Sequence, residues 1–557
     1  MYIKIMCGIF SVINHNNKHE YSRLINYNFK RGSARGPEYS KLTTIQEEKE
    51  SNIILGFHRL AINGLNEKSH QPLVYEGCRL ICNGEIYNYK ELYESIGVVP
   101  QTDSDCEVII HYYKKYGIKQ TLSRLRGVYA FVLVDEISGF TYVARDIYGV
   151  RPLFVGNMIE EGDSSLCFAS EMKMLHLFTH NIRQVQPGSF YSFSREDETN
   201  IWKQIGHEIF YNKDIFVPIY NENYSKEKAL ALIRESLTEA VQIRVETTDR
   251  PIACLLSGGL DSSLITSLVK KCLGENQVLE TYSIGFEGSE DLKYARKVAD
   301  FLKTDHHEIV VKEEDFLNEI PNVVSIIESY DTTTVRASVG NYLVAKYISQ
   351  HSKAKVIFNG DGSDEVTGGY LYFHKAPTME EFHEECLRLL KDIHYFDVLR
   401  SDRTISGNGL EARTPFLDEV FVRNYFTLPI ELRFHAMNNQ CEKYLLREAF
   451  KGYLPDEVLF RTKEAFSDGV SKQTRSWYEI IQEYVETQKN KIVHEERTYN
   501  TPTTNEQLYY RSLFEKSYKY SEKVIPYFWM PRFVEATDAS ARTLKFYKEK
   551  IENENKI

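Results

Sequence analysis

The chain has 557 residues, of which 42% are hydrophobic and 26% charged, and its formal net charge is −11. This length predicts more than one domain, and the composition is typical of a globular protein. The negative charge argues against nucleic-acid binding, and the longest clean apolar run, Tyr129–Val134, is far too short to cross a membrane.

The nine cysteines are scattered along the chain and include no Cys-x-x-Cys pair. This spacing favours free thiols over a zinc site or a disulfide scaffold. The first residues carry one lysine and no long apolar segment, so the sequence indicates no secretory signal. We therefore expect a reducing compartment, the cytoplasm.

The first ten residues, MYIKIMCGIF, contain two methionines, and Cys7 follows the second. Tyr2 is bulky, whereas Cys7 is small enough to permit removal of the methionine before it. We expect translation to start at Met6, or residues 1–6 to be removed, so that Cys7 becomes the first residue. Its free α-amine, with a pKa of about 7.7–8.0, could then take the proton of the thiol.

Short strands dominate the first ~210 residues, as turn spacing and alternation indicate. We predict strands over 79–83, 130–135, 140–144 and 188–193, with a hairpin joining the second and third. This pattern predicts an α+β domain with mostly antiparallel pairing over residues 7–210. A polar linker over 211–224 follows.

Four residues of this first half suit a bound glutamine. The Asn83 amide and the Gly84 N–H follow a predicted strand and could form an oxyanion hole. Arg59 could pair with an α-carboxylate, and Asp105 with an α-ammonium. Taken singly, Arg59 or Asp105 could equally be part of a surface ion pair.

The pattern changes from Ser225, a candidate N-cap of a helix. Predicted strands over 252–256, 279–284 and 355–358 alternate with helices from about 262 and over 292–302. This alternation predicts an α/β domain with a parallel sheet, mainly helical after ~370, over residues 225–540. A charged tail, 541–557, ends the chain.

The sharpest signal in this half is Ser257-Gly-Gly-Leu-Asp-Ser-Ser263, between a strand and a helix. Its glycines let backbone N–H groups approach an anion, and the helix start adds positive potential. Asp261 could hold Mg²⁺. No Gly-x₄-Gly-Lys-[Ser/Thr] is present, so this is not a P-loop of that class. A serine-rich turn without a ligand is the alternative.

A second cluster, Asn359–Glu365, follows the strand at 355–358 and holds three carboxylates, those of Asp361, Asp364 and Glu365. Such carboxylates repel one another unless a cation is near. The cluster is either a solvated acidic turn or a Mg²⁺-ATP and substrate site at the edge of the sheet. Lys463 could balance its charge and that of a phosphate.

The ordered set of motifs resembles the glutamine-hydrolysing asparagine synthetases. The matching segments are Cys7–Phe10, Arg35–Pro37, Asn83–Asn88, Ser104–Glu107, Ala144–Asp146, Ser170–Lys173, Ser257–Ser263, Tyr330–Thr333, Arg336–Ser338, Gly368–Pro377, Gly409–Asp418 and Lys463–Gly469. The resemblance implies an Ntn-hydrolase-like αββα sandwich with glutaminase activity. An ATP-pyrophosphatase ("PP-loop") domain, which forms β-aspartyl-AMP, would follow it.

The resemblance also implies a set of site residues. The implied catalytic residues are Cys7, Asn83, Gly84, Asp361 and Lys463. Glutamine would meet Arg59, Leu60, Ala61, Ile62, Asn63, Asn83, Gly84, Glu85 and Asp105. ATP would meet Leu256, Ser257, Gly258, Gly259, Asp261, Ser262, Ser263, Ile284, Asn359 and Gly360. Arg336, Asp364, Glu365 and Arg413 would surround aspartate and the intermediate, and Asp261 and Asp364 would hold Mg²⁺. The implied small-molecule partners are L-glutamine, L-aspartate and ATP, and the family is often homodimeric.

Three departures from the family pattern stand out. Asn359-Gly-Asp361 replaces Ser-Gly-Glu, so the carboxylate is one methylene shorter. Because small misplacements slow catalysis, we expect an effect on synthetase rate rather than on reaction class. Ala34 and Glu38 replace the usual His and Asp around Arg35-Gly-Pro, with a small expected effect on loop packing. Five residues precede Met6.

Three alternatives to the full enzyme remain open. If residues 1–6 persist, Cys7 lacks a free amine, and the chain would be an ammonia-dependent ligase with an inactive glutaminase half. A relative that closes a β-lactam ring is disfavoured by the complete glutamine set. A non-catalytic regulatory protein is disfavoured by the intact Ser257–Ser263 loop.

Overall fold

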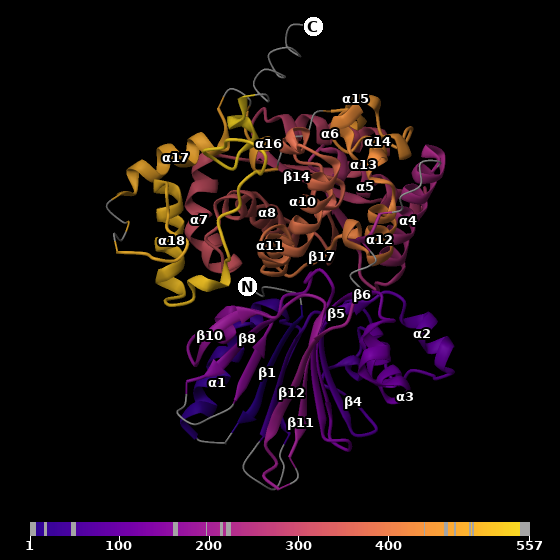
Figure 1. Cartoon of the computed structure of the whole chain (residues 1–557), viewed down its shortest axis with the longest axis vertical. Helices are drawn as coiled ribbons and strands as arrows, with labels where there is room; N and C mark the ends of the chain where they lie inside the picture. The colour runs from indigo at the N-terminus through magenta and orange to yellow at the C-terminus, as the bar shows by residue number, and fades with distance from the viewer. Residues whose placement is uncertain are drawn as a thin grey trace, which may run out of the picture.

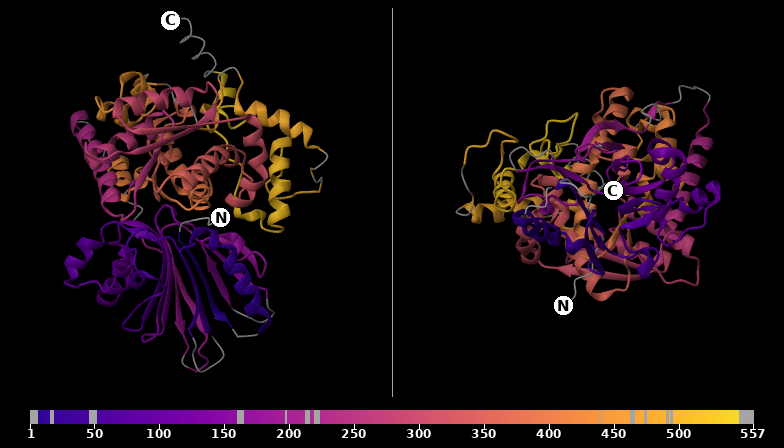
Figure 2. Two further views of the ribbon diagram at one scale, coloured as in Figure 1. Left: turned by 180° about the vertical axis from the view of Figure 1, so that it is seen from behind. Right: turned by 90° about the horizontal axis from the view of Figure 1, so that it is seen from below.

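The chain folds into two lobes, an N-terminal one built on β-sheets and a larger, mainly helical one (Figures 1 and 2). This computed structural model describes residues 7–15, 19–45, 52–159, 165–196, 198–211, 216–218, 224–438, 440–461, 466–472, 475–489, 492 and 495–545. The predicted linker is largely outside these residues, and so is most of the predicted tail. We call the lobes the N-terminal and the C-terminal domain.

Two antiparallel six-stranded sheets pack face to face in the N-terminal domain. The first has the order β10-β8-β9-β1-β3-β2 and the second β12-β11-β7-β6-β5-β4. Their strands are β1 (Gly8–His15), β2 (Tyr39–Ile45), β3 (Asn52–Arg59), β4 (Leu73–Tyr75), β5 (Cys78–Ile86), β6 (Gly127–Asp135), β7 (Phe140–Arg145), β8 (Phe154–Met158), β9 (Leu166–Ala169), β10 (Thr179–Gln184), β11 (Ser189–Arg195) and β12 (Trp202–Ile209).

The period of two along each strand decides which side chains fill which layer. Ile9 and Ile13 of β1 meet Val132 and Val134 of β6 between the sheets. The intervening residues of β1 face α1 (His19–Arg31), and those of β6 face α2 (Tyr89–Ile96) and α3 (Val108–Leu122). The result is the αββα sandwich that the resemblance implies.

A five-stranded parallel sheet with the order β15-β14-β13-β16-β17 organises the C-terminal domain. Its strands are β13 (Ile252–Leu255), β14 (Glu280–Phe286), β15 (Asp305–Val311), β16 (Val356–Phe358) and β17 (Glu411–Arg413). After β13 the chain adds β14 and then β15 on one side of it, and it later returns to add β16 and β17 on the other side. The order of the strands therefore switches direction between β13 and β16. In open parallel sheets, ligands bind at the carboxyl ends of the strands beside such a switch point.

Helices cover both faces of this sheet, as its apolar strands require. They are α4 (Lys226–Glu246), α5 (Leu260–Leu273), α6 (Glu290–Leu302), α7 (Glu313–Ile327), α8 (Thr332–His351), α9 (Ser363–Thr367), α10 (Met379–Asp392), α11 (Asp397–Ser406), α12 (Glu419–Thr427), α13 (Ile430–Arg433), α14 (Tyr444–Ala449), α15 (Asp456–Leu459), α16 (Phe466–Gly469), α17 (Trp477–Thr487) and α18 (Asn505–Ser517).

The predicted strands and the hairpin are confirmed, and the Ser225 hydroxyl caps α4 by accepting a bond from the Lys228 N–H. Short strands were expected throughout the first ~210 residues, but β1, β2, β3, β4, β8, β9, β10 and β12 were not placed individually. In the parallel sheet, two strands were not predicted. β15 is an edge strand that begins Asp305-His-His-Glu308, and β17 has only three residues. β15 is polar, so its sequence lacks the alternation of apolar and polar residues that predicts a strand. β17 is too short to show such a pattern.

Candidate active sites

Cys7 lies where β1 begins, beside the end of β3. Its Sγ donates to the Leu60 carbonyl at 3.2 Å and accepts from the Leu60 N–H at 3.4 Å. Burial raises the pKa of the thiol to about 12, with smaller opposing effects from the Leu60 bond and Arg59. At neutral pH the thiol therefore stays protonated unless a base stands next to it. Residues 1–6 lie outside the described residues.

The predicted glutamine residues gather around this thiol. Arg59 donates from its Nη atoms to carbonyls of the loop after it, including that of Asn66 at 2.9 Å. Asn63 joins the two buried acids, because its Nδ2 lies 2.5 Å from Glu85 Oε2 and 3.4 Å from Asp105 Oδ1. Burial raises the pKa of Asp105 to about 6. These contacts bring polar groups of both signs together within one small region.

The predicted oxyanion residues sit on β5. Asn83 Nδ2 lies 3.5 Å from Ser170 Oγ, which also accepts from the Ile9 N–H at 3.0 Å, so Ser170 links Asn83 to β1. Asn83 Oδ1 is buried and has no hydrogen-bond partner among the described residues. A Cβ at Gly84 would overlap the carbonyl of Val128, so glycine is required by close strand packing.

Glu38, one of the departures from the family pattern, has a defined partner set. Its carboxylate accepts from the Ala61 N–H at 2.7 Å and pairs with Arg250 of the C-terminal domain at 2.7 Å. Arg250 also donates to the Ala61 carbonyl at 2.7 Å. The longer Glu38 side chain thus ties the Leu60–Asn63 segment to the other domain.

In the C-terminal domain, the serine loop follows β13 and precedes α5 as predicted, and it lies at the switch point of the sheet. The Ser262 hydroxyl accepts from the Ser257 N–H at 3.1 Å, which folds the loop back on the start of α5. Gly258 has a φ of 74°, a conformation that favours glycine. The loop after β16 packs directly against it, because Ser363 Oγ donates to Asp261 Oδ1 at 2.8 Å.

These two loops form the floor of a pocket. Of the predicted ATP residues, all but Gly258 and Ser263 line it; Asp361, Asp364 and Glu365 line it as well. Asp361 is held on both sides, by Arg400 of α11 at 2.8 Å and by the Asn359 amide at 2.8 Å. Burial and the neighbouring Asp397 raise the pKa of Glu365 well above its usual range, and Tyr370 donates to Glu365 at 2.6 Å.

Two predicted residues do not reach this pocket. Arg336 is buried between Glu506 of α18 and Asp538, at 2.6 and 2.7 Å. Arg413 donates to the Thr247 carbonyl of its own domain at 2.9 Å and lies 3.4 Å from Glu85 of the N-terminal domain. Neither lines the pocket. In this structure both guanidinium groups are engaged by other groups, and the expectation that they surround aspartate stays a prediction. Lys463 lies outside the described residues.

Several charged residues that line the pocket or contact its lining were missed in the sequence. Lys443 reaches Asp261 and Asp364, while Asp397 and Arg400 come from α11. Lys443 and Arg400 stand far from the two loops in sequence and belong to no short motif. Only the unusual density of charges in Asp397–Arg403 offered a signal for α11.

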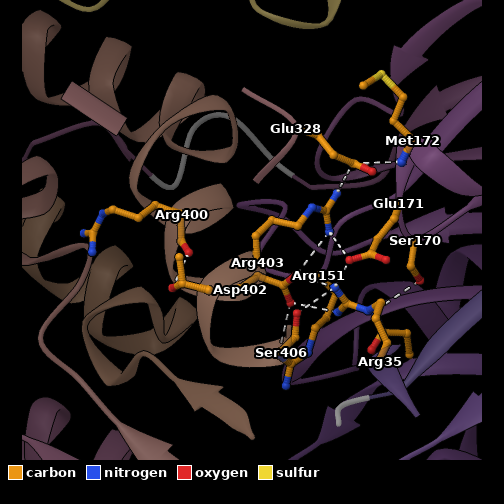
Figure 3. A network of polar contacts seen from close by, with 12 residues as sticks. Arg35, Arg151, Ser170, Glu171, Met172, Glu328, Arg400, Asp402, Arg403 and Ser406 are labelled. Atoms are coloured by element: carbon orange, nitrogen blue, oxygen red, sulfur yellow. Dashed lines mark hydrogen bonds and ion pairs between the residues drawn. The ribbon is translucent and has the colours of Figure 1, made fainter. Parts of the chain in front are cut away.

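Helix α11 also forms the interface with the N-terminal domain (Figure 3). Asp402 accepts a two-pronged bond from Arg35 at 2.7 and 3.0 Å, and Arg35 Nε donates to the Cys7 carbonyl at 2.8 Å. Arg403 pairs with Glu328 at 3.1 Å, and Glu328 accepts from two backbone N–H groups of the N-terminal domain. Arg400 points the opposite way in the figure, so one helix serves both sites.

The donor set of the pocket fits a magnesium ion. Asp261 and Asp364 offer hard carboxylate oxygens beside a phosphate-type loop, and Mg²⁺ is commonly held by one or two carboxylates plus substrate phosphates. No group of three or more His, Cys, Asp or Glu side chains that could hold a metal occurs among the described residues. The nine cysteines are all described, and none of them forms a disulfide. None of the described helices is both long and apolar enough to cross a membrane.

Two family models cover most of the chain. Residues 6–211 match the model of the glutamine amidotransferase domain, and residues 232–382 and 375–534 match that of asparagine synthase. Together with the two sites, these matches define a glutamine amidotransferase domain fused to an ATP-using synthetase domain.

Curated relatives extend the similarity over nearly the whole chain. Asparagine synthetase [glutamine-hydrolyzing] of Gallus gallus is 41% identical over 546 residues, 93% of this chain and 95% of that protein. The Homo sapiens protein of the same name is 40% identical over 541 residues, with the same coverage. The chain belongs to the family of glutamine-hydrolysing asparagine synthetases.

Proposed function

We propose that this protein makes L-asparagine from L-aspartate, with ATP as the energy source and L-glutamine as the nitrogen donor. The products would be asparagine, glutamate, AMP and pyrophosphate. The observation that carries the proposal is the pairing of two sites. A half-buried thiol lies among groups suited to glutamine, and a phosphate-type loop lies at the switch point of a parallel sheet. Helix α11 contacts both.

In the N-terminal domain, we assign the nucleophile to Cys7. Its α-amine, freed by removal of residues 1–6, would take the thiol proton, and the thiolate would attack the carboxamide carbon of glutamine. Asn83 Nδ2 and the Gly84 N–H would donate to the oxyanion. Ammonia would leave as the carbonyl re-forms, and water would hydrolyse the thioester to glutamate. Arg59 would hold the α-carboxylate, and Asp105 and Glu85 the α-ammonium.

In the C-terminal domain, the β-carboxylate of aspartate would attack the α-phosphorus of ATP and displace pyrophosphate. The Ser257–Ser263 loop would hold the departing phosphates, and Leu256, Ile284 and Gly360 would contact the adenosine. Ammonia would then attack β-aspartyl-AMP and displace AMP. Asp361, oriented by Arg400 and Asn359, would take the proton that the attacking nitrogen loses. Asp364 and Glu365 would face aspartate, and Lys463 the phosphate charge.

Magnesium, when bound, would neutralise and align the phosphates, and Asp261 and Asp364 are its proposed protein ligands. Ammonia would travel between the domains through the protein interior. We further propose that the protein is a homodimer and that it is cytoplasmic. The nine cysteines, none in a disulfide, support the cytoplasm, since thiols persist in reducing compartments.

The proposal is tested by product analysis with the full chain. With aspartate, ATP, Mg²⁺ and glutamine, we expect AMP, pyrophosphate and asparagine in equal amounts. Omitting aspartate should stop pyrophosphate release. ADP in place of AMP, or pyrophosphate release without aspartate, would contradict the proposal.

A second candidate is an ammonia-dependent ligase without glutaminase activity. The raised pKa of the Cys7 thiol favours it for any form of the chain that keeps residues 1–6, because such a form has no amine beside the thiol. The intact mass of the purified native protein, combined with assays on glutamine and on ammonium chloride, decides between the two. A protein that retains residues 1–6 and still hydrolyses glutamine at Cys7 would refute the role of the α-amine.

A further inference from the structure

A buried lysine occupies the point where the two loops of the synthetase pocket meet. The Nζ of Lys443 lies 2.6 and 2.7 Å from the two oxygens of Asp261 and 2.7 Å from Asp364 Oδ1. It also donates to Ser363 Oγ at 3.2 Å. The lysine side chain is 1% exposed. One ammonium thus joins the loop after β13 to the loop after β16.

The surroundings are shaped for this lysine. Gly369 lies against it, and a Cβ at that position would overlap both the Lys443 side chain and Asp364. The backbone of Lys443 has a φ of 59°, which non-glycine residues adopt only where the structure enforces it. Packing, a strained backbone and three charged contacts therefore fix the ammonium between the same two acids.

These acids are the proposed ligands of the divalent cation. An ammonium and a divalent cation both need the carboxylate oxygens, so each weakens binding of the other. The balance changes when ATP enters, because its phosphates supply further hard oxygens for the metal and a negative partner for the displaced ammonium.

We propose that Lys443 is a positioning residue that competes with the divalent cation for Asp261 and Asp364, so that the cation binds tightly only together with ATP. This inference rests on the proposed function for the identity of the nucleotide and the cation. Lys443 would in addition keep the two loops at a fixed separation before the substrates arrive. Premature metal binding, which would pull the acids together without phosphates, is thereby avoided.

The test is a Mn²⁺ titration of the full chain, with free Mn²⁺ followed by electron paramagnetic resonance. The nucleotide probe is α,β-methylene-ATP, which cannot be cleaved at the bond that adenylation breaks. In the wild type we expect weak Mn²⁺ binding without nucleotide and one site at least about 100-fold tighter with it, the order expected where unit charges are in contact. In Lys443→Met, the tight site should form without nucleotide.

Three variants control the result. Lys443→Met combined with Asp261→Asn should lose the gained site, which locates it. Lys443→Arg keeps the positive charge and should keep the nucleotide dependence. Lys346→Met removes an exposed lysine paired with Glu319 and should behave as wild type. Thermal unfolding of each variant reports whether it is folded.

Equal Mn²⁺ affinity of the wild type with and without the nucleotide would overturn the proposal. So would a folded Lys443→Met protein with the wild-type dependence, or a gained site in Lys443→Arg. If Lys443→Met does not fold, the wild type and Lys443→Arg still decide. The titration needs no turnover. A protein that makes no asparagine would therefore refute the proposed function, while the competition between Lys443 and the cation could still be measured.

Discussion

The two sites of this molecule are built in different ways. Around Cys7, the hydrogen bonds of the thiol are made with the backbone of Leu60. In the proposed mechanism, the reactive step there depends on a single amine at the chain end. The synthetase pocket instead collects charged side chains from two loops and from α11, and Lys443 pairs with an acid of each loop. The first site is therefore sensitive to processing of the chain end, whereas the second depends on charge balance.

This contrast predicts that glutaminase activity can be abolished without loss of ammonia-dependent synthesis. Cys7→Ala should lower glutamine-dependent asparagine synthesis by about 10⁴-fold or more, because the nucleophile is lost. Synthesis from ammonium chloride should change by less than about twofold, since Cys7 lies outside the pocket.

Cys272→Ala is the matched control, because this half-buried thiol lies outside both sites. Steady-state rates with each nitrogen donor give the answer. Equal loss of both activities in Cys7→Ala would show that the sites are not separable.

A substitution in the interface between the domains should affect both stability and the glutamine site. Arg35→Met leaves Asp402 buried without its two-pronged partner and removes a donor from the Cys7 carbonyl. We expect a stability loss of about 3–5 kcal/mol, as for other broken buried pairs. We also expect kcat/KM for glutamine to fall by about 100-fold, as for other misplaced catalytic groups.

Arg79→Met is the control, because its pair with Glu136 is roughly one-third exposed and should contribute at most about 1 kcal/mol. Chemical denaturation and glutaminase assays measure both effects. If Arg35→Met and Arg79→Met lower the free energy of unfolding by the same amount, the buried network does not hold the domains together.

Asp361, which stands where the family has a longer Glu, allows a comparison within the synthetase pocket. Asp361 is bound by Asn359 and by Arg400, so a longer Glu at this position would displace the Asn359 amide. Asp361→Glu alone should slow asparagine synthesis by about tenfold through misplacement. Adding Asn359→Ser, which restores the family pair, should recover most of the loss.

A double-mutant cycle on the ammonia-dependent rate measures this coupling. Additive effects of the two substitutions would mean that Asn359 and Asp361 act independently.

The smallest effect concerns pH. Burial raises the pKa of Asp105 to about 6 in the free enzyme. Above that pH Asp105 is charged and can bind the glutamine α-ammonium; as the pH falls through it, protonation removes this charge. We expect kcat/KM for glutamine to drop by up to about tenfold per unit below pH 6. This fall in rate below pH 6 should be absent when ammonium chloride is the nitrogen donor, once the rates are corrected for the pH-dependent fraction of free ammonia.

Much of the fold was predictable from periodicity and turns. The predicted strands that became β5, β6, β7 and β11 indicated a mainly antiparallel α+β domain, and the alternation of strands and helices after Ser225 indicated the parallel sheet. The αββα sandwich itself came from the resemblance to the family. β15 was missed because an edge strand can be polar. The order of the strands in either sheet depends on contacts between distant segments, which no local pattern records.

The sites divide in the same way. Cys7, Asn83 and the serine loop sit in short motifs with their own chemistry, and they were found. Lys443 and Arg400 act through single long-range contacts, and they were missed. Arg336 and Arg413 were placed in the pocket from motif similarity, but their positions along α8 and β17 direct them to other carboxylates and to carbonyl groups.

The most direct test of two sites acting as one enzyme is nitrogen transfer from labelled glutamine. The full chain would be incubated with [amide-¹⁵N]glutamine, aspartate and ATP in the presence of unlabelled ammonium chloride, and the asparagine analysed by mass spectrometry. Our account predicts predominantly ¹⁵N-labelled asparagine, with one AMP formed for each asparagine. Asparagine carrying only unlabelled nitrogen while glutamine is hydrolysed would contradict it.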